Sequence, residues 1–281
     1  MTSFPFSLYN PFAVRKPNFL DAKMKTRNIA LTFFGVVLAT IFTTEVSAQT
    51  PFVETYTFSQ ANSTSGTTDP TTPPTTPSAV VDLAFGSFTS TGASANPNAT
   101  GRFSFTSQPL GGVPNSDDFS QFTGSLSPTV YFEVTLTPLG VIEYQIDSIT
   151  FSVRRSGTGV RSYAVRSSVD GFASNLPAII NNGNANLGIG PANELQWLFD
   201  ATSNAADQDG SQINPGVSHA SLTTPVTFRF YGWNAEAGTG TFSVDNVAFS
   251  GSTRPGVPEP TTGCLLALGI AALAFAGRRR V

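Results

Sequence analysis

Between residues 50 and 252 the sequence is built from short runs in which apolar and polar residues alternate. Gly, Pro, Asn or Asp interrupts nearly every gap between these runs. Alternation with a period of two places the apolar side chains on one face of a strand. No stretch of this segment has a helical period, so we expect eight to ten short strands and no helices. The pattern predicts an all-β fold, a jelly-roll-like β-sandwich.

The run at residues 226–233 shows how the alternation assigns two faces. The predicted core face carries Val226, Phe228 and Phe230. The opposite face carries Arg229, Tyr231 and Trp233. Aromatic rings beside an arginine on a sheet surface are able to stack on and clamp sugar rings, so these three residues are candidate sugar-binding residues. The alternative is that a loop covers this face, or that it packs within the sandwich.

The charge of the segment limits its partners. Six Arg stand against fifteen Asp and Glu between residues 49 and 252, a net charge of −9, and this segment contains no lysine. Such a chain is a poor nucleic-acid binder. The single cysteine, Cys264, lies near the C-terminus, so the segment has neither disulfide bonds nor thiol chemistry. An exported domain without disulfides must hold its fold by the size of its core.

No catalytic apparatus is visible in the sequence, and we predict that the protein is not an enzyme. His219 is the only histidine and stands in a polar run, where we expect it to be solvated. One isolated histidine excludes His-based metal triads and argues against a Ser-His-Asp site. A pair of carboxylates could still cleave a polysaccharide, but fifteen acids give no basis for choosing a pair.

We predict no cofactor and no metal site, with structural calcium as the alternative. Asp207-Gln208-Asp209-Gly210 resembles part of a calcium loop, but Ala205 and Gly216 stand where ligands are needed. Asp245 interrupts the last alternating run. A turn or bulge that Asp245 stabilises through its own backbone is the preferred interpretation of that break.

The N-terminal region contains an export signal. Residues 24–48 begin with Lys25 and Arg27, continue with an apolar stretch and end in Val-Ser-Ala, which predicts a signal peptide cut by signal peptidase between Ala48 and Gln49. Residues 1–23 have no organised pattern. They represent either a misplaced start codon before Met24 or an extension of the signal.

The mature part is therefore predicted to begin at residue 49. Residues 49–252 form the predicted sandwich, and residues 66–79, rich in Thr and Pro, form a loop within it. An O-glycosylated stretch is the alternative interpretation of this loop.

Residues 253–281 form a tail with three parts in fixed order. Val-Pro-Glu-Pro is followed by an apolar run, of which residues 263–276 carry no charge, and then by three arginines. The run is at the short limit for a transmembrane helix. The arginines would hold the C-terminus on the cytoplasmic side of the membrane. These properties alone allow an ordinary C-terminal anchor.

The order of the three parts resembles the PEP-CTERM sorting signal of bacteria. The residues that carry the resemblance are Val257, Pro258, Glu259, Pro260, Arg278, Arg279 and Arg280. It implies recognition by exosortase, a membrane cysteine peptidase, and a cut near the Pro-Glu-Pro. The protein would be anchored transiently in the membrane and then reach the cell surface or extracellular matrix. The same motif is also labelled an ice-binding protein C-terminal domain, which carries no evidence of ice binding.

The part from residue 131 to residue 251 is similar to the β-sandwich passenger common among PEP-CTERM proteins. The shared features are an Arg-Arg-Ser-Gly turn, a Ser-x-Asp-Gly-Phe turn and a final Asp-Asn-Val strand. We therefore expect an exported, non-enzymatic protein of the cell surface or matrix, associated with exopolysaccharide or biofilm. The alternatives are a carbohydrate-binding module and, less favoured, a polysaccharide-cleaving enzyme.

Overall fold

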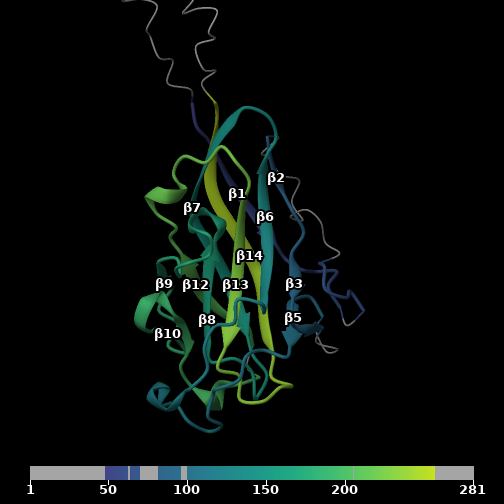
Figure 1. Ribbon diagram of the computed structural model, residues 1–281, viewed down its shortest axis with the longest axis vertical. Coiled ribbons are helices and arrows are strands. Elements are labelled where there is room, and N and C mark those ends of the chain that lie inside the picture. Colours follow the sequence, from purple (N-terminus) through teal and green to yellow (C-terminus); the bar gives the residue numbers. More distant parts are fainter. Residues whose placement is uncertain (1–47, 63, 70–81, 96–99, 205, 257–281) are drawn as a thin grey trace, which may run out of the picture. The chain divides into compact units, whose positions relative to one another are not determined.

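The computed structural model describes residues 48–62, 64–69, 82–95, 100–204 and 206–256. These residues form two antiparallel sheets that pack face to face, as Figure 1 shows, and contain no α-helix. The structure confirms the all-β prediction. The N-terminal 47 residues, the sorting residues Val257 to Arg280 and most of the Thr/Pro-rich loop lie outside the described residues.

Sheet A has the strand order β4-β5-β14-β7-β12-β9, and β1 also pairs with β14. Its strands are β1 (Thr50–Tyr56), β4 (Ser94–Ala95), β5 (Phe103–Thr106), β7 (Ile142–Arg154), β9 (Ala178–Ile180), β12 (Gln208–Ile213) and β14 (Phe242–Pro255).

Sheet B has the strand order β10-β11-β8-β13-β6-β2, and β3 also pairs with β6. Its strands are β2 (Leu83–Phe85), β3 (Thr89–Thr91), β6 (Tyr131–Pro138), β8 (Ser162–Ser167), β10 (Leu187–Ile189), β11 (Leu195–Trp197) and β13 (Val226–Trp233). Five single 3₁₀ turns interrupt the connections: η1 (Phe119–Gln121), η2 (Ser168–Asp170), η3 (Pro191–Asn193), η4 (Asp200–Thr202) and η5 (Val217–His219).

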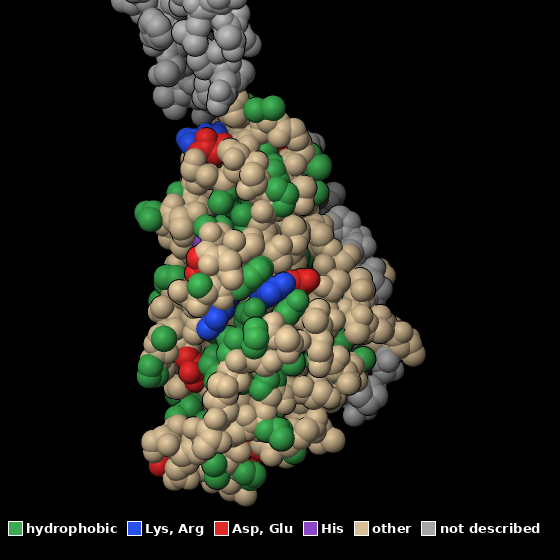
Figure 2. Space-filling model, viewed as in Figure 1, with side chains coloured by type: hydrophobic (Ala, Val, Ile, Leu, Met, Phe, Trp, Pro, Cys, Tyr) green, Lys and Arg blue, Asp and Glu red, His purple; other side chains and the backbone are tan. Residues whose placement is uncertain are grey.

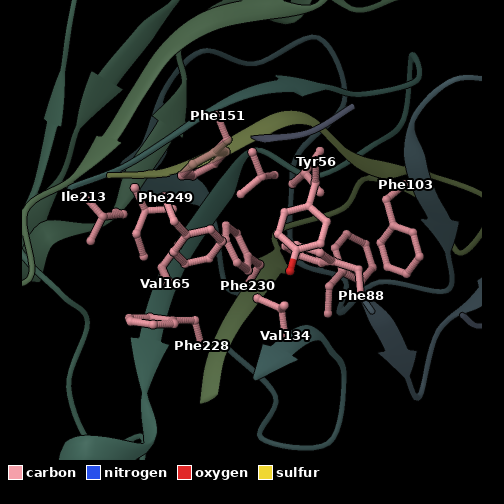
Figure 3. Packing of buried hydrophobic residues seen from close by; sticks show 14 of the residues in the cluster. Tyr56, Phe88, Phe103, Val134, Phe151, Val165, Ile213, Phe228, Phe230 and Phe249 are labelled. Carbon is pink, nitrogen blue, oxygen red and sulfur yellow. The ribbon is translucent and has the colours of Figure 1, made fainter. Parts of the chain in front are cut away.

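The core lies between the sheets and is dominated by phenylalanine, as the close-up in Figure 3 shows. Phe151 of β7 meets Phe230 of β13 edge to face, with ring centroids 5.3 Å apart. Phe132 of β6 stacks on Phe242 of β14 at 5.2 Å. Each buried ring of this kind stabilises the fold by about 1.5–3 kcal/mol relative to an exposed one. The rings therefore supply the cohesion that disulfides provide in smaller exported domains.

Alternation in the sequence marks strand β13 correctly, whereas strand β12 does not alternate. The core face of β13 is Val226, Phe228 and Phe230, as predicted. The polar strand β12 includes residues of the stretch that resembles part of a calcium loop, and its register against β7 shifts between Gln208 and Ser211. This bulge breaks the period of two, so no alternation marks the strand in the sequence.

The two chain ends of the sandwich leave from neighbouring strands. The first residue of β1, Thr50, pairs with Thr253 near the end of β14 (Figure 1). Ala48 and Gln49, where signal peptidase is predicted to cut, are exposed next to β1. Among the residues described, no helix is long and apolar enough to cross a membrane, and the predicted span lies beyond them.

Candidate functional site

The outer face of sheet B is covered, which corrects the expectation of an exposed aromatic platform. Tyr231 and Trp233 are 2% and 5% exposed and pack with Ala164 in a second hydrophobic cluster. Leu126 packs against this cluster from the segment that precedes β6. The prediction that Tyr231 offers a free ring face is therefore wrong, because a segment about one hundred residues earlier in the chain lies over it.

Arg229 is also engaged by its own chain. Its guanidinium lies between two rings, 4.0 Å from the centroid of Tyr131 and 3.9 Å from that of Phe172. Its Nε donates to Glu133 Oε2 at 2.9 Å across the β13–β6 pair. Figure 2 shows basic, acidic and hydrophobic side chains side by side in the middle of the visible face. Arg229 thus stabilises the sheet through contacts within its own chain and does not offer a free guanidinium to a ligand.

A pocket of about 360 Å³ opens beside Trp233 on this covered face. Its wall combines aromatic rings with a carboxylate and two amides. The residues that form these parts are Phe119, Phe122, Trp233, Glu194, Gln196 and Asn234. Ligand pockets typically pair apolar and aromatic walls with a few polar groups that fix orientation. Trp233, a candidate from the sequence, therefore borders an open cavity.

The 3₁₀ turn η1 places the two phenylalanine rings. Asp118 caps the turn, because its Oδ1 accepts from the backbone N–H of Ser120 at 3.0 Å. Hydrogen bonds from the Ser120 side chain and backbone lower the pKa of Asp118. The rings of Phe119 and Phe122 then lie over the Arg161 guanidinium, which is 5.4 Å and 5.2 Å from their centroids.

Arg161 is fully buried and fastens the covering segment to the sandwich. It donates to the carbonyl of Ser116 at 2.7 Å and to Asp117 Oδ1 at 3.0 Å on the covering side. On the other side it donates to the carbonyls of Trp197 and Leu198. A buried guanidinium with this many partners fixes both elements in one geometry.

A second buried arginine, Arg155, extends this network. Its Nη2 donates to Glu236 Oε1 at 2.7 Å, and its Nη1 lies 3.0 Å from Asp200 Oδ1. Burial lowers the pKa of Arg155 and raises the pKa of Glu236, because both lose hydration. Arg155 belongs to the Arg-Arg-Ser-Gly stretch, and Arg161 follows four residues after its end, so this part of the chain forms a buried ion-pair network rather than only a surface turn.

The polar side chains of the pocket differ in how far they are already satisfied. Asn234 Oδ1 accepts from the Gly124 N–H at 2.8 Å, and its Nδ2 donates to Ser162 Oγ at 3.0 Å. Gln196 Nε2 has a longer bond of 3.3 Å to Glu194 Oε1. Gln196 and Glu194 therefore retain most of their hydrogen-bonding capacity for a ligand.

His219 is buried, so the prediction of a solvated side chain is wrong. It is 1% exposed, lies over Phe228, and its ring nitrogens are both 2.9 Å from hydroxyls, of Ser218 and Ser167. Burial lowers the pKa of His219. Ser167 is itself 1% exposed. The pair is closed to substrate and serves packing.

Asp245 stands at a bulge, as the preferred interpretation of its sequence predicted. The register between β14 and β7 shifts after Asp245, and its Oδ1 accepts from the Asn246 N–H at 2.7 Å. Burial, with the nearby charges of Asp207 and Asp209, raises the pKa of Asp245 to about 6. Among the described residues no three His, Cys, Asp or Glu side chains form a group suited to a metal ion.

The geometry defines a class: an all-β sandwich with a buried arginine network and an open aromatic pocket on one covered sheet face. The profile of the PEP-CTERM protein-sorting motif matches residues 256–280, directly after β14. The chain thus carries a PEP-CTERM sorting motif, which indicates an exported protein that exosortase processes. No curated protein and no solved structure matches the chain.

Sequence reasoning identified Trp233 and missed the rest of the pocket. Phe119 and Phe122 stand in a stretch with no strand pattern, and Glu194 and Gln196 flank Leu195 in the short strand β11. The Asp118-Phe-Ser-Gln sequence is a capping signal that could have located η1. Nothing local indicated that η1 would lie over β13.

Proposed function

We propose that this exosortase-sorted protein is a non-enzymatic component of the cell surface or extracellular matrix that associates with exopolysaccharide. The pocket beside Trp233 is the observation that carries the proposal. Aromatic rings offer apolar faces to sugar C–H groups, while Glu194 and Gln196 offer an acceptor and a donor to sugar hydroxyls. The proposal develops the carbohydrate-binding alternative from the sequence. It assigns the sugar contacts to the residues of the pocket instead of to Tyr231 and Arg229.

The composition of the pocket favours binding over cleavage. Glycoside hydrolysis uses two carboxyl groups flanking the scissile bond. Within the described wall of the pocket Glu194 is the single carboxylate. A reducing-end assay on the producer's exopolysaccharide is expected to give no product, and release of reducing ends would overturn the non-enzymatic part of the proposal.

Retention on polysaccharide tests the binding. The mature protein and a Gln196→Ala variant would be expressed in the producing organism and passed over its immobilised exopolysaccharide. Loss of a neutral hydrogen bond of about 0.5–1.5 kcal/mol predicts affinity about threefold to tenfold weaker for the variant. Equal retention of both proteins would contradict the assignment of the pocket.

A matched control is Gln145→Ala on sheet A. The Gln145 amide also donates to a nearby carboxylate, Asp147 Oδ1 at 2.9 Å, but on the other sheet. We expect this variant to bind like the unmodified protein. An equal loss in both variants would indicate that retention is nonspecific.

A further inference from the structure

A second pocket, of about 350 Å³, lies on the outer face of sheet A and has a different chemistry. Arginine and hydroxyl side chains dominate its wall. The residues that matter are Arg102, Arg154, Ser156, Thr239, Thr241 and Ser243. No carboxylate lines the pocket among the described residues. It is therefore a donor-rich cavity, in contrast to the pocket beside Trp233.

Three arginines line the pocket: Arg102, Arg154 and Arg155. Arg155 is already paired with Asp200 and Glu236, whereas neither Arg102 nor Arg154 forms an ion pair among the described residues. Arg102 Nε is buried without a hydrogen-bond partner among the described residues. Arg154 Nη2 has one long bond of 3.5 Å, to the carbonyl of Asn204. The guanidinium groups of Arg102 and Arg154 therefore keep donors that an oxyanion in the pocket could use.

Two hydroxyls of the pocket, those of Ser156 and Thr241, are arranged to donate, whereas Ser243 already donates to Ser104 Oγ at 2.6 Å. Ser156 and Thr241 form a reciprocal pair in which each side-chain oxygen accepts from the other residue's backbone N–H, at 3.0 Å and 2.9 Å. With an acceptor position thus occupied, each O–H proton remains for an external acceptor. Donors converge on the cavity from the β7–β8 connection and from the segment that leads into β14.

We propose that this pocket binds a carboxylate or sulfate group carried by an acidic polysaccharide. Guanidinium groups form their strongest hydrogen bonds with planar or tetrahedral oxyanions. The proposal rests on the exposure of the sandwich to exopolysaccharide, but it uses a different pocket on the other sheet. It adds a ligand class, charged sugar units, that the aromatic pocket does not select.

Acidic neighbours make Arg102 and Arg154 unequal as binding residues for an oxyanion. Asp245, which senses the charge of Arg102, is close to Asp207 and Asp209. The Asp245 carboxylate therefore partly neutralises Arg102, whereas the residue opposite Arg154 in the β7–β14 register is Ser243 rather than an acid. We therefore expect Arg154 to contribute more to oxyanion binding, and we expect binding to weaken with added salt.

The test uses polygalacturonate, dextran sulfate and neutral dextran as separate probes for the mature protein. Arg154→Gln is expected to weaken binding to the acidic polymers about tenfold, as loss of a charge-assisted hydrogen bond implies. Loss with polygalacturonate alone would identify a carboxylate ligand, and loss with dextran sulfate alone a sulfate ligand. Arg254→Gln is the charge-matched control, because Arg254 is 40% exposed and pairs with Glu143.

The outcomes separate this inference from the proposed function. If Arg154→Gln and Arg254→Gln weaken acidic-polymer binding equally, or neither does, the inference is overturned. Gln196→Ala is expected to retain acidic-polymer binding while losing retention on exopolysaccharide through the aromatic pocket. Circular dichroism melting of each variant shows whether a loss reflects misfolding, and Arg154→Lys, which keeps the charge, should then restore part of the binding.

Discussion

The outer faces of the two sheets follow the same alternation of side chains, but one is covered by another segment of the chain and the other carries a polar pocket. On sheet B the outward residues of β13 are aromatic, and a segment held by Arg161 and Asn234 covers them. On sheet A the outward residues at the start of β14 are Ser243 and Asp245, and Ser243 lines the donor-rich pocket. Alternation therefore determines which side a residue faces, and a distant segment determines whether that side meets solvent.

The comparison also explains why the two pockets differ in chemistry. On sheet B the pocket forms where the cover ends, so its wall is the edge of a hydrophobic cluster. On sheet A the pocket wall is polar and consists mainly of arginine and hydroxyl side chains. Two predictions test the cover itself, and those that follow test the buried titratable groups of each sheet.

The largest expected effect is on the covering segment. Arg161→Met removes the bonds to Ser116 and Asp117 and leaves Glu236 and Asp200 with one arginine fewer. Breaking a buried charge network of this kind destabilises by about 3–5 kcal/mol. Urea unfolding measures it, with Arg254→Met at an exposed ion pair as control. A loss below about 1 kcal/mol would show that the cover is not held by Arg161.

Asn234→Gly is expected to have the next largest effect. It deletes the bonds to Gly124 and Ser162, and an unsatisfied buried group costs about 1–3 kcal/mol. Asn234 has φ +56°, which glycine adopts freely, so this change isolates the side chain. Asn234→Ala should lose about 1 kcal/mol more because of the left-handed backbone. Equal stability of the two variants would contradict the expectation that the left-handed backbone at residue 234 disfavours alanine.

The third prediction concerns the pH dependence of stability that Asp245 of sheet A causes. The pKa of Asp245 rises from 3.8 to about 6, so the folded protein binds more protons than the unfolded chain between these values. This group makes stability fall as pH increases from about 4 to about 6. We expect Asp245→Asn to flatten that slope and raise the Tm at pH 7. A lower Tm at pH 7 would show that ionised Asp245 stabilises the fold.

His219 is expected to give the smallest effect, with the opposite slope. Its pKa lies below the usual 6.5, so the unfolded chain binds more protons and stability falls as the pH drops below 6.5. His219→Gln keeps hydrogen bonds to Ser167 or Ser218 without titrating. The variant should lose this slope in melting curves recorded between pH 7 and pH 5, and an unchanged slope would refute the assignment.

Calcium adds a check on the same region of sheet A. The sequence predicts no metal site, since the stretch at residues 207–210 lacks two ligands of a calcium loop, so we expect millimolar calcium to leave the Tm unchanged. A rise in Tm that Asp245→Asn abolishes would instead establish the structural calcium site that the sequence offered as an alternative.

The sequence predicted the fold class and core faces because both depend on local alternation, as in Phe228 and Phe230. It could not predict the cover over Tyr231, because that contact joins residues about one hundred positions apart. It also missed the buried state of His219, whose polar neighbours Ser218 and Ser167 supply its hydrogen bonds. Polar residues that satisfy one another inside a fold leave no hydrophobic pattern to detect.

We propose that the sandwich is the mature protein and that the tail is a sorting signal removed by exosortase. The chain would be expressed in a host with its exosortase and in one without it, and the product weighed by mass spectrometry. We predict a product that begins at Gln49 and, only in the competent host, ends near the Pro-Glu-Pro at residues 258–260. A product from the competent host that still contains residues 263–281 would contradict the claim.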